Sequence, residues 1–195
     1  MRTATINRRT NETDIALSVN LDGRGVYENH TGVGFLDHML DLFARHGRFD
    51  LTVRCAGDTY VDDHHSVEDI GIALGTALRE ALADKRGINR YGSMLLPMDE
   101  ALILCAVDIS GRDCLGWRVD IPTEKIGTFD TQLVKEFWLA LSRALGASVH
   151  FQQLAGENSH HIVEGMFKAA GRAFRQAVAV DPAFADEIPS TKGVL

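Results

Sequence analysis

An internal repeat constrains the fold of this chain more than any other feature. Residues 64–83 and 160–179 align without a gap and are identical at ten of twenty positions, and both copies begin with His-His-x-x-Glu. The similarity extends upstream, where "FLDHMLDLFARHG" parallels "LVKEFWLALSRALG". Repeated sequence indicates repeated structure, so we expect two similar half-domains, about 1–93 and 94–195, within one folded unit.

Each repeat is predicted to combine strands and helices. In some segments apolar residues occupy every second position, as in a strand, and in others they recur at intervals of three and four residues, as on one face of a helix. The predicted helices cover residues 35–46, 65–83, 131–145 and 161–179, and the predicted strands cover residues 14–21, 48–55, 101–110, 113–121 and 147–154. Extending the repeat further upstream aligns the apolar residues Leu17, Val19 and Leu21 of the first strand with Trp117, Val119 and Ile121. Each half is therefore predicted to run strand, strand, helix, strand, helix. The expected fold class is α+β, with a mostly antiparallel sheet backed by two helices in each half and with the helices of the two halves packed together.

Charge and composition exclude several classes of function. The net charge of −7 argues against nucleic acid or an anionic membrane as the main partner. No run of about 18 apolar residues predicts a membrane span, and the N-terminal segment lacks the apolar core of a signal peptide. Cys55, Cys105 and Cys114 show no paired spacing, so we expect reduced thiols and a cytoplasmic protein.

The two His-His-x-x-Glu motifs have the chemistry and spacing of metal ligands. Residues i and i+4 share a helix face, so the first histidine of each motif can act with its glutamate. The second histidine turns about 100° away and is available to another metal ion. The preceding helix adds His38 in the first half and Glu136 at the same position of the second. The candidate ligands are His38, His64, His65, Glu68, Glu136, His160, His161 and Glu164.

A structural role is the alternative for each of these residues. A histidine at a helix start is often a surface or capping residue, although Ser, Asp and Asn are the commoner caps. Glu136 taken alone fits a solvated carboxylate as well as a ligand. The recurrence of the motif at equivalent places favours metal binding. Imidazole and carboxylate without thiolate favour Mn, Fe, Co, Ni or Zn in an open site over a closed structural zinc site.

Several longer motifs extend the pattern over essentially the whole chain. They are "RRTNETDI", "TGVGFLDHMLDLFARHG", "DDHHSVEDIGIALG", "GENSHHIVEGMFKA" and "PSTKGVL". With these motifs the sequence resembles imidazoleglycerol-phosphate dehydratase of histidine biosynthesis. The resemblance implies four helices packed between two sheets, a homo-oligomer of 24 subunits, and active sites between subunits that each carry two Mn²⁺ ions.

The resemblance also assigns roles to individual residues. It makes the candidate ligands above metal ligands, although the position of Glu136 is commonly His in the family. A carboxylate is a harder ligand than imidazole and still suits Mn²⁺. The implied substrate-binding residues are Glu12, His38, His46, His64, His65, Glu68, Arg90, Arg112, His160, Ser190, Thr191 and Lys192. Arg90, Arg112 and Lys192 supply the positive charge that a phosphate requires.

The implied reaction is loss of water from imidazoleglycerol phosphate to give imidazoleacetol phosphate. Our hypothesis is that two metal ions hold the ring as an imidazolate, which then expels the hydroxyl on its attached carbon. Glu12 is the first candidate for the acid/base and His46 the second. A metal-dependent hydrolase and a non-catalytic metal store are the alternatives. The sequence leaves open whether His150 faces the site.

Overall fold

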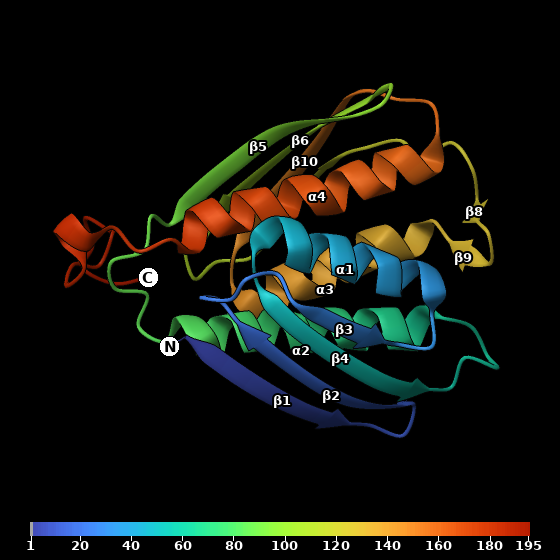
Figure 1. Ribbon diagram of the computed structural model, residues 1–195, viewed down its shortest axis with the longest axis horizontal. Coiled ribbons are helices and arrows are strands. Elements are labelled where there is room, and N and C mark those ends of the chain that lie inside the picture. Colours follow the sequence, from blue (N-terminus) through green and yellow to red (C-terminus); the bar gives the residue numbers. More distant parts are fainter. Residues whose placement is uncertain (1) are drawn as a thin grey trace.

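Two sheets enclose four helices in the computed structural model, which describes residues 2–195 (Figure 1). The first half contains β1 (Thr3–Arg9), β2 (Thr13–Asn20), β3 (Tyr27–His30), α1 (Gly34–Gly47), β4 (Asp50–Gly57) and α2 (His64–Leu82). The second half contains β5 (Tyr91–Met98), β6 (Ala101–Asp108), β7 (Cys114–Arg118), β8 (Lys125–Ile126), β9 (Phe129–Asp130), α3 (Gln132–Leu145), β10 (Ser148–Ala155), α4 (Ser159–Val178) and the short 3-10 helix Pro182–Phe184. All four helices lie within two residues of their predicted bounds.

The two sheets have the same topology. Their strand orders are β1-β2-β4-β3 and β5-β6-β10-β7. In each sheet the first three strands are antiparallel, and the last strand, β3 or β7, pairs in parallel with its neighbour. The predicted α+β fold, with four helices between two mostly antiparallel sheets, is therefore confirmed, and the sheets are consistent with duplication of one unit.

The first half has three strands before its first helix and the second half has five, where two were predicted in each. β1 and β3 are edge strands rich in polar residues, although Ala4 and Ile6 of β1 pack against the core. β5 contains Pro97, which an edge strand tolerates because it leaves one side of the ladder unpaired. By its place in the sheet, β2 matches β6 and not the segment around Trp117, so the predicted phase with Trp117, Val119 and Ile121 was wrong. A half boundary at residues 93/94 falls inside β5, and the connection between α2 and β5 spans residues 83–90.

The inner faces of both sheets and the helices form one hydrophobic core. Ile15, Leu17 and Val19 of β2 alternate inward with at most 3% of their surface exposed. α1 and α2 pack on the first sheet, and α3 and α4 pack on the second. Between the layers, α1 pairs with α4 and α2 pairs with α3. Within residues 2–195, no helix combines the length and the apolar character needed to cross a membrane.

Glycines at equivalent repeat positions let these helix pairs approach closely. A Cβ atom added at Gly171 of α4 would lie 2.7 Å from the carbonyl oxygen of Phe43 on α1. A Cβ atom added at Gly75 of α2 would lie 2.5 Å from the carbonyl oxygen of Leu141 on α3. Both distances are far inside van der Waals contact, and both neighbours are backbone atoms that cannot rotate away. The duplicated chain has therefore kept the same helix contact in both halves.

Replacement of Gly171 by alanine should destabilise the fold by about 1–3 kcal/mol, because α1 and α4 must separate to accommodate the new methyl group. Gly34→Ala is the matched control, since a Cβ atom at that helical position meets no atom within 4 Å. Urea unfolding followed by circular dichroism measures both changes. Equal midpoints for Gly171→Ala and the wild type would show that the helix pair is looser than this contact requires.

Candidate metal centre

The start of α4 fixes the orientation of the second His-His-x-x-Glu motif. The side chain of Asn158, the N-cap, accepts hydrogen bonds from the backbone N–H groups of His160 and His161. With the helix begun at this point, His160 and Glu164 lie one turn apart on one face. Their Nε2 and Oε2 atoms are 3.1 Å apart. The predicted pairing of first histidine and glutamate is therefore present in the second half.

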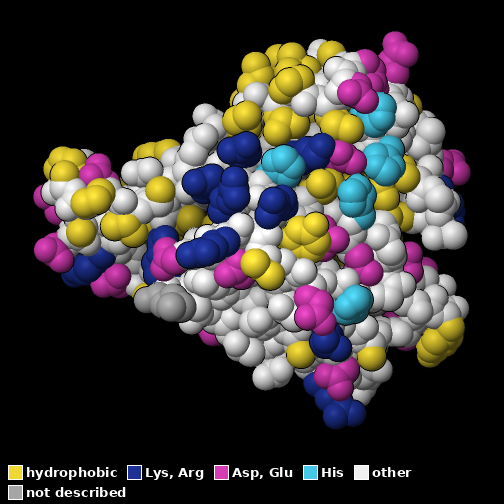
Figure 2. All heavy atoms as spheres, in the orientation of Figure 1, with side chains coloured by type: hydrophobic (Ala, Val, Ile, Leu, Met, Phe, Trp, Pro, Cys, Tyr) yellow, Lys and Arg dark blue, Asp and Glu magenta, His cyan; other side chains and the backbone are white. Residues whose placement is uncertain are grey.

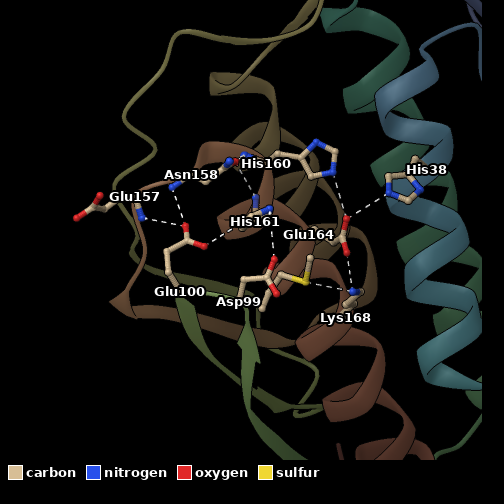
Figure 3. Close-up of polar contacts among 10 residues, drawn as sticks. His38, Asp99, Glu100, Glu157, Asn158, His160, His161, Glu164 and Lys168 are labelled. Carbon is tan, nitrogen blue, oxygen red and sulfur yellow. Dashed lines mark hydrogen bonds and ion pairs between the residues drawn. The ribbon is translucent and has the colours of Figure 1, made fainter.

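A third candidate ligand reaches the same glutamate from the neighbouring helix. Nε2 of His38, on α1, lies 3.3 Å from Oε2 of Glu164 (Figure 3). The donor atoms of His38, His160 and Glu164 all lie within 4.8 Å of one another. Among residues 2–195, this is the one group of three such side chains that is so closely spaced.

Lys168 lies on the next turn of α4, with its Nζ atom 2.5 Å from Oε1 of Glu164. Burial alone would raise the pKa of Glu164, but Lys168, His38 and His160 hold it below its ordinary value. The glutamate, 8% exposed, is therefore an anion held among three nitrogen-bearing side chains. Lys168 was not predicted. Its position four residues after Glu164 could have indicated an ion pair on one helix face. The repeat gave no such indication, because the equivalent residue of the first half is Ile72.

The first half repeats this arrangement in part. His64 and Glu68 lie one turn apart on α2, with Nε2 and Oε2 separated by 3.6 Å. Glu136, the counterpart of His38, is half-buried on α3, the helix that packs against α2. These three side chains do not reach the spacing of the His38 group in this chain.

The second histidine of each motif contacts a different carboxylate from the first. The ring planes of His64 and His65 differ by 82°, and so do those of His160 and His161. Nδ1 of His65 lies 3.0 Å from Oδ2 of Asp58, and this hydrogen bond raises the pKa of His65.

His161 is held in the same way by a different residue. Nδ1 of His161 lies 2.7 Å from Oε2 of Glu100, and this hydrogen bond raises the pKa of His161. The same contact, followed by a hydrogen bond from the backbone of Asn158, lowers the pKa of Glu100 to about 2. Neither Glu100 nor Asp58 was predicted, because nothing in their spacing links them to the motifs.

The two candidate acid/base residues lie in different surroundings. Glu12 is exposed in the β1–β2 turn, with Oε1 3.6 Å from Nε2 of His65. His46 is half-buried on α1, about 12 Å along the helix from His38 by the rise per residue. Burial lowers the pKa of His46, and the charges of Lys168 and Arg172 lower it further. Figure 2 shows the lysine and arginine side chains of this face gathered around a histidine, next to the other histidines.

The remaining predicted residues lie at the other end of the molecule. Arg90 binds Asp108, with Nε and Oδ1 2.7 Å apart, and donates from Nη1 to the carbonyl oxygen of Pro189 at 3.0 Å. This contact anchors the tail that carries Ser190, Thr191 and Lys192. The exposed Arg112 is at the same end, because the neighbouring Gly111 lies against the C-terminal Leu195. α4 separates this end from His160 with 20 residues, about 30 Å of helix (Figure 1).

His150 does not belong to either cluster. It is exposed on β10, and its ring covers Gly116 of the neighbouring strand β7. Val149 and Phe151, on either side, point into the core. Because side chains alternate along a strand, His150 lies on the outer face of the second sheet, away from the helices.

Comparison with known proteins connects this arrangement to a single family. The family model for imidazoleglycerol-phosphate dehydratase matches residues 31–174. Enzymes with that name from Jannaschia sp. and Dinoroseobacter shibae are each 62% identical over 195 residues, with complete coverage of both chains.

Solved structures agree with the sequence relatives. The imidazoleglycerol-phosphate dehydratase of Staphylococcus aureus superposes with a TM-score of 0.84 at 40% identity and covers 92% of this chain and 99% of its own. The Pyrococcus furiosus enzyme in complex with (S)-C348 also superposes with a TM-score of 0.84, at 41% identity, covering 97% and 100%. With its duplicated fold, its paired histidine motifs and these relatives, the chain belongs to the imidazoleglycerol-phosphate dehydratase family, hydro-lyases of histidine biosynthesis.

Proposed function

We propose that this dehydratase converts imidazoleglycerol phosphate to imidazoleacetol phosphate at a site that holds two Mn²⁺ ions. The observation that supports the metal ions is the convergence of His38, His160 and Glu164 from two helices to within 4.8 Å. A buried carboxylate between two imidazoles is costly unless a cation compensates it, and Lys168 alone reaches only one of its oxygens.

The donor set fits a hard, open-site metal. Two imidazoles and one carboxylate suit Mn²⁺ and leave coordination positions for a substrate or water. The second ion would be held by His64, Glu68 and Glu136, which occupy the repeat positions equivalent to His160, Glu164 and His38. When bound, the two ions would lower the pKa of the substrate's imidazole ring and so favour loss of the neighbouring hydroxyl. The two nitrogen atoms of that ring match the two duplicated sites.

The second histidines would complete the sites of neighbouring subunits. His65 and His161 are hydrogen-bonded to Asp58 and Glu100, which lie outside the ligand clusters of their own motifs. Each offers a ring nitrogen at the molecular surface, where another copy of the chain can use it. We propose a homo-oligomer with shared active sites, of 24 subunits as the family resemblance implies.

The location of the substrate-binding residues also supports shared sites. Arg90, Arg112 and the tail residues lie at the end of the molecule opposite the His38 cluster. One small substrate cannot contact both ends, so the phosphate would be bound by the arginines and tail of one subunit beside the metal ions of another. Lys168 and Arg172, next to His46, would add positive charge from the metal-binding subunit.

Glu12 would move the proton during the reaction. Its carboxylate is exposed next to Nε2 of His65, so it would face the same shared site as that ring. It would accept the proton from the second carbon of the side chain after the hydroxyl leaves, and the resulting enol becomes the ketone. His46 is the second candidate, because burial and nearby cations favour its neutral, proton-accepting form.

Removal of metal should abolish dehydration. Chelator-treated protein is expected to lose activity towards imidazoleglycerol phosphate and to regain it at about two Mn²⁺ ions per chain. Ultraviolet absorbance measures the dehydration, and phosphate release from the same compound is the control for a hydrolase. Full activity after complete metal removal would contradict the proposed metal ions.

Glu12→Gln should lower kcat by about 10²–10⁴-fold with unchanged Mn²⁺ content, since the amide cannot accept the proton. Asp14→Asn is the matched control, because Asp14 is an exposed carboxylate two residues away whose one ion pair within residues 2–195 is with the exposed Arg9 at 3.7 Å. Steady-state kinetics and metal analysis measure both variants. Wild-type turnover by Glu12→Gln would transfer the acid/base role to His46.

Mixed assemblies should test whether sites are shared. His160→Ala damages the metal-binding end, and the double variant Arg112→Ala/Lys192→Ala damages the opposite end. Random co-assembly of equal amounts should give about one quarter of wild-type activity, because one quarter of the sites combine two intact ends. Each variant refolded alone is the control. No recovery in the mixture, with co-assembly verified by differential tags, would place both ends in one subunit's site.

A further inference from the structure

His65 and His161, the second histidine of each motif, both form a contact that metal binding alone does not explain. In each ring Nδ1 is hydrogen-bonded to a carboxylate, Asp58 for His65 and Glu100 for His161. Nε2 of each ring has no hydrogen bond within residues 2–195. Nε2 of His65 lies 3.6 Å from Oε1 of Glu12, and Nε2 of His161 lies 3.7 Å from Oδ2 of Asp99. The two rings therefore present the same nitrogen to the surroundings.

The two carboxylates come from different places in the repeat. Asp58 follows β4 in "AGD", and the matching "AGE" of the second half carries Glu157. The carboxylate of Glu157 points away from His161, and Glu100 of the β5–β6 turn takes the place beside the ring (Figure 3). A hydrogen bond between Nδ1 of the second histidine and a carboxylate therefore occurs in both halves, although the two carboxylates occupy different positions of the repeat. This recurrence indicates that the second histidine needs a carboxylate at Nδ1, whichever loop provides it.

Glu100 is itself held in place by the loop that begins α4. Its Oε1 atom accepts hydrogen bonds from the backbone N–H groups of Asn158 at 2.9 Å and Glu157 at 3.3 Å. Its Oε2 atom remains for His161. Because Asn158 also caps the helix, one carboxylate links the turn, the cap and the ring. Asp58 is held through its backbone, whose N–H donates to the carbonyl oxygen of Glu12, and its side chain is 15% exposed.

We propose that Asp58 and Glu100 are positioning residues of the metal centre, each fixing one second histidine so that Nε2 is the nitrogen that binds metal. A carboxylate only accepts hydrogen bonds, so Nδ1 must carry the proton and Nε2 must present its lone pair. The inference rests on the proposed two-metal site and extends it to residues that are not ligands.

Glu100→Gln separates this role from simple structural support. Glutamine keeps the length of the side chain, and its carbonyl oxygen can still accept from Asn158 and Glu157. Its amide nitrogen then faces His161 as a donor, which favours the tautomer with the proton on Nε2. We expect one of the two Mn²⁺ ions to bind about 10–100-fold more weakly, with the other unchanged.

The measurement is a Mn²⁺ titration of the metal-free assembled protein, with the paramagnetic resonance signal of unbound Mn²⁺ as the readout. Thermal unfolding of the metal-free protein checks that each variant is folded. Glu157→Gln is the matched control, because it removes the same charge beside Asn158 without touching His161. It should bind both ions as the wild type does.

The outcomes distinguish the two proposals. Two tightly bound ions in Glu100→Gln would overturn the positioning role and leave the two-metal site intact. No Mn²⁺ binding by the wild type would overturn the two-metal site, and the positioning role with it. If Glu100→Gln does not fold, Asp58→Asn makes the same test at His65, where the other ion should be the weakened one.

Discussion

The close contact of helices across the middle layer determines where the functional side chains can meet. Gly171 lets the backbone of α4 lie against the carbonyl oxygen of Phe43, and at this separation His38 on α1 reaches Glu164 on α4 at 3.3 Å. A side chain at Gly171 would push the two helices apart, because its Cβ atom would lie 2.7 Å from that carbonyl oxygen. The convergence of His38, His160 and Glu164 therefore depends on the packing of residues that carry no chemistry.

Much of the fold and part of the site could be predicted from the sequence. The helices have strong 3.6-residue periodicity and lie within two residues of their predicted bounds, whereas the edge strands β1 and β3 are rich in polar residues and the edge strand β5 contains Pro97. The His160–Glu164 pair followed from helix spacing alone. Glu100 could not be found in this way, because its contact with His161 depends on how a turn of the sheet folds over the start of α4. The repeat pointed instead to Glu157, whose side chain faces elsewhere.

Duplication has produced two related clusters that differ in charge. His38 of the first half corresponds to Glu136 of the second, and Lys168 of the second corresponds to Ile72 of the first. The cluster around Glu164 therefore contains a lysine, and it has an imidazole at the position where the other cluster has a carboxylate. Two metal ions held by these clusters would experience different fields, and they would act on the two ends of an imidazole ring that is itself asymmetric once it carries a side chain.

The His38 cluster and the arginines with the tail lie at opposite ends of α4, and this separation affects how a defective copy of the chain would act beside a normal one. Under the proposed arrangement, every chain contributes metal ligands to one active site and arginines with the tail to another. A chain damaged at both ends therefore inactivates sites that its intact neighbours would otherwise complete. In a cell that makes normal and damaged copies together, activity would fall further than the share of damaged chains, and the defect would behave as a dominant one.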